Sequence, residues 1–154
     1  MNQETADYVR GKAKVVAVSD AFRLAPWADF LVSNDRKWWE ANPEAYLFKG
    51  RKFCSHPLNK AESFRKHVHM GRNSGLMGMC LAKDLGAKRI LLCGFDMHGT
   101  HFFGEHGHGL KNTTEKIFKV HVRQFDRFSG CNVVNCTAGS RLLKFPFGNL
   151  YDLI

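Results

Sequence analysis

The sequence predicts an α/β fold built on a mainly parallel sheet of about five strands. Two observations lead to this class. Segments of strand character alternate along the chain with segments of helical character. The candidate strands are also continuous apolar runs, which is typical of parallel strands that helices cover on both faces. Together these features predict a Rossmann-like three-layer sandwich.

The candidate elements follow one another in a regular order. Apolar runs predict strands at 13–19, 29–35, 50–55, 88–95 and 131–136. Helical patterns predict a short turn at 20–25 and helices at 36–46, 59–69, 74–85 and 114–128. Pro26 and Pro43 interrupt the patterns, while Gly86 and Gly130 supply stop signals for the last two helices. Residues 99–113 form a predicted loop rich in glycine and histidine.

Length and composition limit the organisation and the compartment. The chain has 154 residues, of which 44% are hydrophobic, so we expect a single domain over residues 1–154. It contains no apolar run of about 18 residues, and its first residues are too polar for a signal peptide. The five cysteines form no CxxC pair and mostly lie in apolar runs, as buried reduced thiols do. These features predict a soluble cytoplasmic protein without a zinc knuckle or a membrane partner.

The formal net charge of +9 favours anionic partners in general. Basic residues are spread along the chain in short groups, without the dense tract that nucleic-acid arms carry. Nucleic acid is therefore a candidate partner, and a solvated basic surface is the alternative.

Four of the predicted strands change from apolar to polar at their carboxyl ends. The polar ends are Ser19-Asp20, Asn34-Asp35, Asp96-Met97-His98 and Asn135-Cys136-Thr137. In open parallel sheets, ligands bind outside these ends. Turn-forming residues alone would explain one or two such ends. Four of them favour a shared polar crevice.

The predicted helix at 74–85 begins at Asn73-Ser74-Gly75. Amide groups in the first turn of a helix lack intrahelical partners, and the helix dipole attracts anions there. The Ser74 hydroxyl, these amides and Arg72 would bind a phosphate group, which Gly75 allows to approach the backbone closely. The alternative is that Asn73 or Ser74 is only the N-cap of the helix.

The segment DMHGTHFFGEHGHG, residues 96–109, follows a predicted strand and is rich in titratable side chains. Histidine transfers protons near neutral pH, so a histidine of this segment is a candidate general acid or base. A second interpretation is a divalent metal held by Asp96 and two histidines, although the spacing matches no standard zinc motif. A polar loop without chemistry is the third. We expect no metal ligand among the site residues.

Two further groups of side chains are candidates for contacts with a base or sugar. Asn135 and Thr137 could read a base or a sugar hydroxyl, and the alternative is a turn with its own side-chain-to-backbone bonds. The pairs Trp38-Trp39 and Phe102-Phe103 could stack on a base, although aromatic residues near helices more often lie in the core. No GxSxG, Walker, GxGxxG or HExxH motif occurs, and no HxE with PCxxC. Hydrolases, P-loop kinases, classical dinucleotide-binding proteins and zinc deaminases therefore lack support.

Three blocks of the sequence are recognisable. They are VVAVSDAFRLAPWADFLVSNDRKWW, NSGLMGMCLAKDLGAKRILLCGFDMHGTHFFGEH and VVNCTAGSRLLKFP. Together they resemble a family of small uncharacterised proteins from phages and prophages, over nearly the whole chain. The last two blocks are also similar, more distantly, to bacterial sialyltransferases that use CMP-sialic acid. They resemble in the same way the Rossmann-like domain of flagellin glycosyltransferases and archaeal pterin pyrophosphokinases.

The resemblance to sialyltransferases implies roles for individual residues. Ser74 and Gly75 match a Ser-Gly that contacts the CMP group, and Ser19 matches a polar residue that contacts the nucleotide. Relatives begin with a strand and a Gly-rich GxGPSL loop, and this sequence starts after them. The resemblance therefore implies a domain that lacks this strand and loop, with an exposed sheet edge at which an oligomer could form.

These observations together predict a phage protein of the host-cell cytoplasm that binds a nucleotide or a nucleotide-sugar. The resemblance implies a glycosyltransferase-like enzyme with His106 as general base; His101 and His108 are alternatives for the base. Asp96, at the end of a predicted strand, is a second candidate catalytic residue. The expected ligand-binding residues are Ser19, Asp35, Arg72, Asn73, Ser74, Gly75, His98, His101, Asn135 and Thr137. No cofactor is identified. The competing function is a non-catalytic phage accessory protein that binds nucleic acid, a signalling nucleotide or a host protein.

Overall fold

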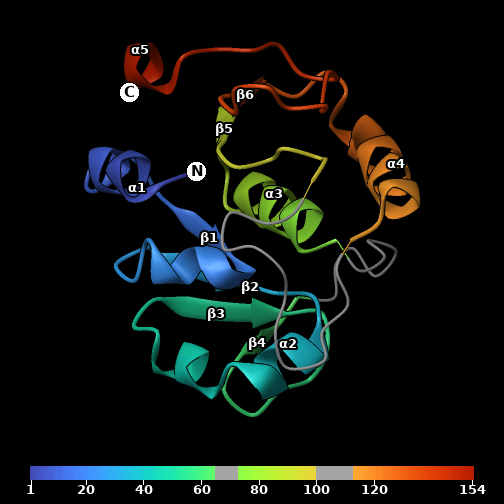
Figure 1. Ribbon diagram of the computed structural model, residues 1–154. Coiled ribbons are helices and arrows are strands. Elements are labelled where there is room, and N and C mark those ends of the chain that lie inside the picture. Colours follow the sequence, from blue (N-terminus) through green and yellow to red (C-terminus); the bar gives the residue numbers. More distant parts are fainter. Residues whose placement is uncertain (65–72, 100–112) are drawn as a thin grey trace. The chain divides into compact units, whose positions relative to one another are not determined.

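The computed structural model describes residues 1–64, 73–99 and 113–154 (Figure 1). The chain divides into two compact units. The N-terminal unit comprises Asn2–Asp84, and the C-terminal unit comprises Leu85–Ile154 together with Met1. Each unit has its own parallel sheet and its own helices. The chain is therefore of the α/β class, as the sequence predicts.

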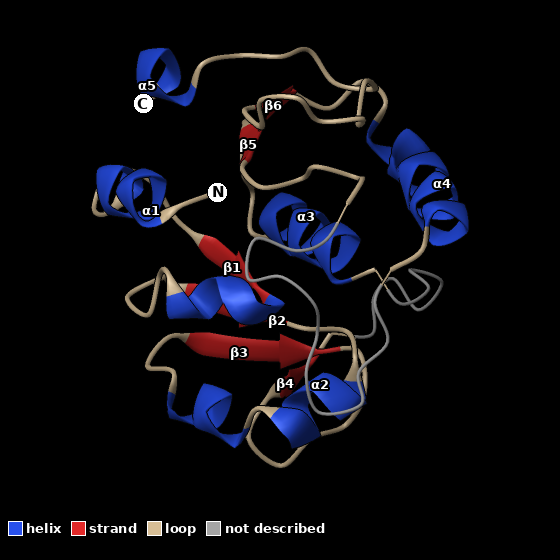
Figure 2. Cartoon of the chain, in the orientation of Figure 1, coloured by secondary structure: helices blue, strands red, loops and turns tan. Residues whose placement is uncertain are grey.

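The N-terminal unit contains a four-stranded parallel sheet with the order β1-β2-β3-β4. Its strands are β1 (Val16–Val18), β2 (Phe30–Val32), β3 (Arg51–Cys54) and β4 (Glu62–Ser63). Figure 2 shows the first three side by side, joined by segments that contain short helices. Leu31 and Val32 of β2 are fully buried, as expected for an inner strand covered on both faces.

The helical segments of this unit lie between and around the strands. They are α1 (Gln3–Val9), η1 (Ser19–Arg23), α2 (Arg36–Ala41), η2 (Pro43–Leu47) and α3 (Ser74–Asp84), where η marks a 3-10 helix. Helix α3 approaches β1 and β2 very closely at Gly78. A Cβ atom at that position would lie 3.2 Å from a Val18 methyl group and 3.4 Å from a Val32 methyl group. Glycine at this position therefore allows the helix backbone to pack directly on the two strands.

Two adjacent tryptophans anchor α2 in the core of the N-terminal unit. The indole nitrogen of Trp38 donates to the Asp20 carboxylate at 2.9 Å, and that of Trp39 donates to the Ser33 carbonyl at 3.0 Å. Phe22 packs edge-on against Trp38 with ring centroids 5.9 Å apart. Trp38 and Trp39 are buried, so of the two roles considered for this pair, core packing is the one the structure shows.

The C-terminal unit contains a two-stranded parallel sheet of β5 (Ile90–Leu92) and β6 (Val133–Asn135). Its helical segments are α4 (Glu115–Gln124), η3 (Phe125–Phe128) and α5 (Leu150–Leu153). Phe125 is completely buried and packs edge-on against Phe95 and Phe145, with ring centroids 6.0 and 6.3 Å away. Phe125 and Phe145 therefore belong to the buried core of this unit.

Most predicted elements occur near their predicted positions, and one is wrong within the part that the structure describes. Residues 59–64 do not form the start of a helix but a turn followed by β4. Strand pairing prevails here because Arg51 holds Glu62 through two hydrogen bonds of 2.8 and 2.7 Å. Phe64 is then buried against Phe53, with ring centroids 6.2 Å apart. Residues 65–69 of the predicted helix lie outside the described residues.

Helices α1 and α5 have no counterpart in the sequence-based prediction. Both begin at an asparagine N-cap, Asn2 and Asn149, whose side chain accepts a backbone N–H of the first turn.

Among the described residues, no helix has the length and apolar character needed to cross a membrane.

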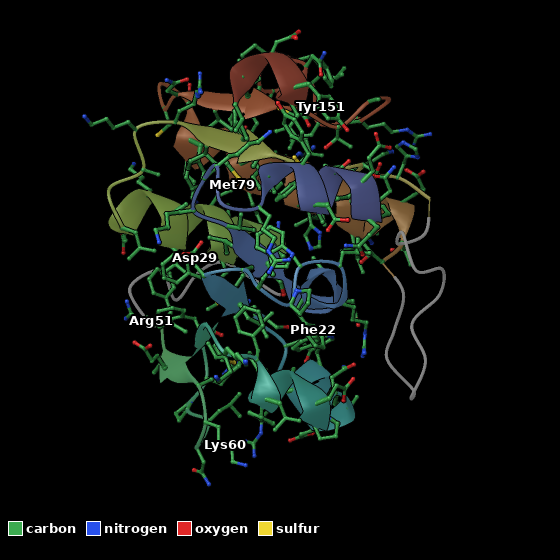
Figure 3. All side chains as sticks on the ribbon, turned by 90° about the vertical axis from the view of Figure 1, so that its left-hand side faces the viewer. Phe22, Asp29, Arg51, Lys60, Met79 and Tyr151 are labelled. Atoms are coloured by element: carbon green, nitrogen blue, oxygen red, sulfur yellow. The ribbon has the colours of Figure 1, made fainter. Side chains whose placement is uncertain are left out.

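We predict that Gly50→Ala strongly destabilises the N-terminal unit. A Cβ atom there would lie 2.4 Å from the carbonyl oxygen of Asp29 and 2.7 Å from that of Ala28. The backbone cannot move away easily, because the Asp29 carbonyl also accepts the Arg51 N–H at 3.0 Å (both residues are labelled in Figure 3). Overpacking of this kind costs about 1–3 kcal/mol in the free energy of unfolding. Urea unfolding should show this loss for Gly50→Ala and almost none for the exposed neighbour variant Lys49→Ala. Equal midpoints for the two variants would refute the close approach.

Candidate functional site

Polar side chains gather in the N-terminal unit where β1, β2 and β3 end and α3 begins. We call this group the strand-end cluster. It consists of Ser19 after β1, Ser33 and Asn34 after β2, Ser55 after β3, and Asn73 and Ser74 at the start of α3. Hydrogen bonds connect Ser19 with Ser33, and Asn34 with both Ser55 and Ser74. The sequence predicts a polar group at such strand ends, and within this unit the polar side chains do lie together.

Ser19 has an unusual backbone conformation for its residue type. Its φ angle is +47°, in the left-handed region, where a non-glycine residue is strained by roughly 1 kcal/mol or more. Its hydroxyl group lies 3.1 Å from the hydroxyl of Ser33. Strained residues of this kind collect at ligand-binding sites, where surrounding contacts hold a side chain in a required place.

The start of α3 is fixed by two separate hydrogen bonds. The Asn73 side chain is the cap of the helix, since its Oδ1 accepts the Leu76 N–H at 2.9 Å. The Ser74 hydroxyl accepts the backbone N–H of Asn34 at 3.0 Å and so connects the helix start to the end of β2. The N–H of Gly75 lies in the first turn, where a helix offers no acceptor of its own. Asn73 is thus the N-cap, while Ser74 has a tertiary contact.

Asp35 lies at the end of the same polar segment and caps α2. Its side chain accepts the Lys37 N–H at 2.9 Å. Negative charge is favourable at the N-terminus of a helix, so the capping of α2 is a structural role that explains an aspartate at this position. Asn34, directly before it, is buried and pairs through its side-chain oxygen with the Ser55 hydroxyl.

In the C-terminal unit, Asp96-Met97-His98 follows β5 in a tightly bent segment. Met97 has a φ angle of +58° and is, with Ser19, a non-glycine residue in the left-handed region. The His98 Nε2 lies 3.1 Å from the Gly139 carbonyl and donates to it, which places the proton of a neutral ring on Nε2. The Asp96 carbonyl accepts the Arg141 N–H at 2.8 Å, and its carboxylate is half-exposed.

The side chains of Asn135 and Thr137 hold the turn after β6. Asn135 accepts the Thr137 N–H at 3.0 Å and donates to the Leu142 carbonyl at 3.1 Å. The Thr137 hydroxyl accepts the Phe95 N–H at 3.0 Å. Both side chains are buried, so the structure shows the turn that was the alternative for this pair. Contacts of either residue with a ligand stay a prediction.

Several predicted site residues fall outside the part of the chain that the structure describes. These are Arg72, His101, His106 and His108. The remaining predicted residues divide between the two units. Ser19, Asp35, Asn73, Ser74 and Gly75 belong to the N-terminal unit, and Asp96, His98, Asn135 and Thr137 belong to the C-terminal unit. Within the described ranges, no three His, Cys, Asp or Glu side chains are grouped in a way that could hold a metal ion.

The cysteine near the end of β5 is not an activated nucleophile. Burial and, to a smaller extent, the neighbouring Cys136 thiol raise the pKa of Cys93 to about 11. The thiolate is the reactive form of cysteine, and very little of it exists at neutral pH with such a pKa. All five cysteines are free thiols.

Sequence reasoning missed Ser33 and Ser55 as members of the cluster. Ser33 follows the last residue of β2 and is fully buried, with its hydroxyl beside Ser19. Ser55 follows β3. A usable signal was present, because each of these serines directly follows the buried last residue of a strand, Val32 or Cys54, much as Ser19 follows Val18.

The chain matches no family model, no curated protein sequence and no solved structure at a significant level. The site must therefore be interpreted from its own residues.

We predict that Ser74→Ala lowers the stability of the N-terminal unit without any ligand present. The substitution leaves the N–H of the buried Asn34 without its acceptor, which costs about 1–3 kcal/mol. Ser129→Ala, at an exposed position of the C-terminal unit, is the control. Hydrogen exchange followed at the Asn34 amide should speed up in Ser74→Ala and stay unchanged in the control. Unchanged exchange in both would show that the bond is not formed.

We predict that His121 on α4 makes stability depend on pH below neutrality. Burial lowers the pKa of its imidazole from the ordinary value of 6.5. The unfolded chain then binds the proton more tightly, so the free energy of unfolding falls as the pH drops below 6.5, until the folded-state pKa is passed. Thermal unfolding between about pH 8 and pH 5.5 should show this loss, and His121→Gln should reduce it.

The Glu62 carboxyl group does not produce the same effect in this range. The hydrogen bonds from Arg51 lower the pKa of Glu62 from 4.5, so its contribution is lost only in more acidic solution. An identical pH dependence for wild type and His121→Gln would contradict the burial of the imidazole.

Proposed function

We propose that this protein binds a nucleotide or a nucleotide-sugar and that the strand-end cluster receives its phosphate group. The observation that carries the proposal is the strained Ser19. Its backbone conformation places its hydroxyl group beside that of Ser33, at the carboxyl end of the sheet. The start of α3 is bound to the same end of the sheet by the hydrogen bond between Ser74 and Asn34. Hydroxyl groups and first-turn amides are the donors with which proteins bind phosphate.

The charges around the cluster support an anionic ligand. Asp20 lies next to Ser19, but its carboxylate accepts from the Trp38 indole at 2.9 Å and from Arg23 at 3.4 Å. The Asp35 carboxylate accepts a backbone N–H at the N-terminus of α2. Both nearby carboxylates are therefore engaged by donors of the protein, and the dipole of α3 favours negative charge at its start.

A Rossmann-like sandwich with a mainly parallel sheet of about five strands is part of the same proposal. Every strand pair in both units is parallel among the described residues, and helical segments alternate with strands along the chain. Parallel sheets need helical crossovers of this kind. In such folds the ligand binds at the carboxyl ends of the strands, where Ser19 lies.

The reaction that we propose is a glycosyl transfer, by the resemblance of the sequence to sialyltransferases. His106 would take the proton from an acceptor hydroxyl, whose oxygen forms the new bond to the sugar carbon. The bond from that carbon to the nucleotide phosphate breaks, and the nucleotide leaves with its electron pair. Arg72 with the start of α3 would stabilise the departing phosphate. His106→Ala should keep the nucleotide bound and abolish transfer.

A phage accessory protein without catalysis is the second candidate function. It would bind a signalling nucleotide, a nucleic acid or a host protein, or assemble through the edge of the sheet at β1. For such a binder, His106→Ala should change neither affinity nor any other measured property.

The first test is a thermal-shift screen against nucleoside mono-, di- and triphosphates and nucleotide-sugars. A ligand at about 100 times its dissociation constant stabilises the folded protein by roughly 2.7 kcal/mol, which is a shift of several degrees. A shift with one class of nucleotide that persists at high salt supports the proposal. No shift with any nucleotide would overturn it.

A pair of matched variants then tests the strand-end cluster. Ser19→Gly removes the hydroxyl and also the backbone strain, so we expect the unliganded protein to keep or gain stability while its affinity for the nucleotide falls about tenfold. Ser129→Gly makes the same change at an exposed position of ordinary backbone geometry and should leave affinity unchanged. Isothermal titration calorimetry measures the affinities. Equal affinity for wild type and Ser19→Gly would exclude Ser19 from the site.

A further inference from the structure

One face of α4 carries an unbroken row of basic side chains. Lys116, Lys119, Arg123 and Arg127 follow one another at intervals of three, four and four residues, with the last in η3, which continues from α4. Residues at these intervals lie on the same face of a helix. All four are exposed. We call this set the α4 basic row; it spans about 16 Å along the helix.

No carboxylate among the described residues forms a salt bridge with the α4 basic row. The two acidic residues of the same helical segment have other partners. Glu115 binds Arg141 at 2.7 Å, and Asp126 binds Lys144. Positive charge therefore remains on this face while the neighbouring negative charges are neutralised. In α2, by contrast, Arg36 is paired with Glu40 one helical turn away, at 3.1 Å.

The stability of the helix does not explain this arrangement. Like charges three or four residues apart destabilise a helix by about 0.2–0.5 kcal/mol for each pair, and the row contains three such pairs in succession. Basic residues near the C-terminus of α4 interact favourably with the helix dipole, but Lys116 lies in the first turn, where a cation is unfavourable. A face that only needs to be soluble would mix both signs of charge. The row therefore costs stability and indicates an external anion.

Side chains on the opposite face of α4 pack against the rest of the C-terminal unit. Phe118 and Val122 are half-buried, and Phe125 is completely buried against Phe95 and Phe145. A helix that lies on a membrane would need this apolar face for the lipid. Part of the apolar surface of α4, drawn in orange in Figure 1, therefore packs in the C-terminal unit, while Ile117, Val120 and the α4 basic row are exposed.

We propose that the α4 basic row binds the phosphate backbone of double-stranded DNA, independently of the nucleotide site proposed above. Duplex DNA presents a dense, regular line of negative charge, which complements a straight row of cations. The row contains no aromatic side chain on which the bases of a single strand would stack. An α-helix also fits the wide major groove of B-form DNA but not the deep, narrow groove of A-form RNA.

The test measures binding of a labelled DNA duplex of about 24 base pairs by fluorescence anisotropy, from about 50 to 200 mM NaCl. The row variant replaces all four residues by glutamine: K116Q, K119Q, R123Q and R127Q. The control variant makes the same change at four exposed lysines that belong to other segments of the chain: K37Q, K49Q, K60Q and K88Q. Both variants lower the net charge equally, so a general charge effect would act on both.

For the wild type we expect tight binding at low salt that weakens steeply as salt rises. Each lost phosphate contact lowers the slope of log affinity against log salt by about 0.9, so the row variant should lose about 3.6 in slope. The control variant should keep the slope of the wild type. The row variant should also unfold at the same temperature as the wild type or higher, because its like-charge pairs are gone.

Three results would overturn the proposal. Equal loss of slope in both variants would mean that only diffuse charge attracts DNA. Absence of DNA binding by the wild type at about 50 mM salt would mean that the row has no such partner. Tighter binding to duplex RNA, to single-stranded DNA or to phosphatidylserine vesicles, lost in the row variant, would assign the row to that polyanion instead.

Discussion

The close approach of α3 to the sheet at Gly78 determines the geometry of the N-terminal unit. Because a glycine faces Val18 and Val32, the helix backbone lies directly on β1 and β2. The first turn of the helix then reaches the carboxyl end of β2, where the Ser74 hydroxyl accepts the Asn34 N–H. A larger residue at position 78 would lift the helix from the strands and separate these groups. The positions of the polar donors at the strand ends thus depend on a residue that has no side chain.

A second constraint comes from the polar contacts of the two tryptophans. The Trp38 indole binds Asp20, which follows Ser19, and the Trp39 indole binds the carbonyl of Ser33. Both bonds are buried, where loss of a partner is costly. Helix α2 therefore holds the backbone next to Ser19 and at Ser33 in place, although none of its own residues belongs to the strand-end cluster. We regard this support as the reason that Ser19 keeps its strained conformation.

The sequence was sufficient to predict most of the strands and the long helices, because their apolar runs and glycine stop signals are local features. It failed at residues 59–64, where the pairing of Glu62 with Arg51 and the burial of Phe64 outweigh local helical character. The strained φ angles of Ser19 and Met97 could not be predicted either, since they result from tertiary contacts. The polar strand ends were visible in the sequence, but the different uses of Ser74, Asp35 and Thr137 follow only from their hydrogen-bond partners.

The four-stranded sheet has a short, charged strand, β4, at one edge, and these two properties limit aggregation. Strand β4 has only two residues, both exposed, and Glu62 is held by Arg51 of the adjacent strand. Such a short, charged edge offers few free backbone groups to a strand from another molecule. Lys60, labelled in Figure 3, adds a further charge in the turn just before it. Folded molecules are thereby protected on this side from edge-to-edge association, the first step toward amyloid-like assembly.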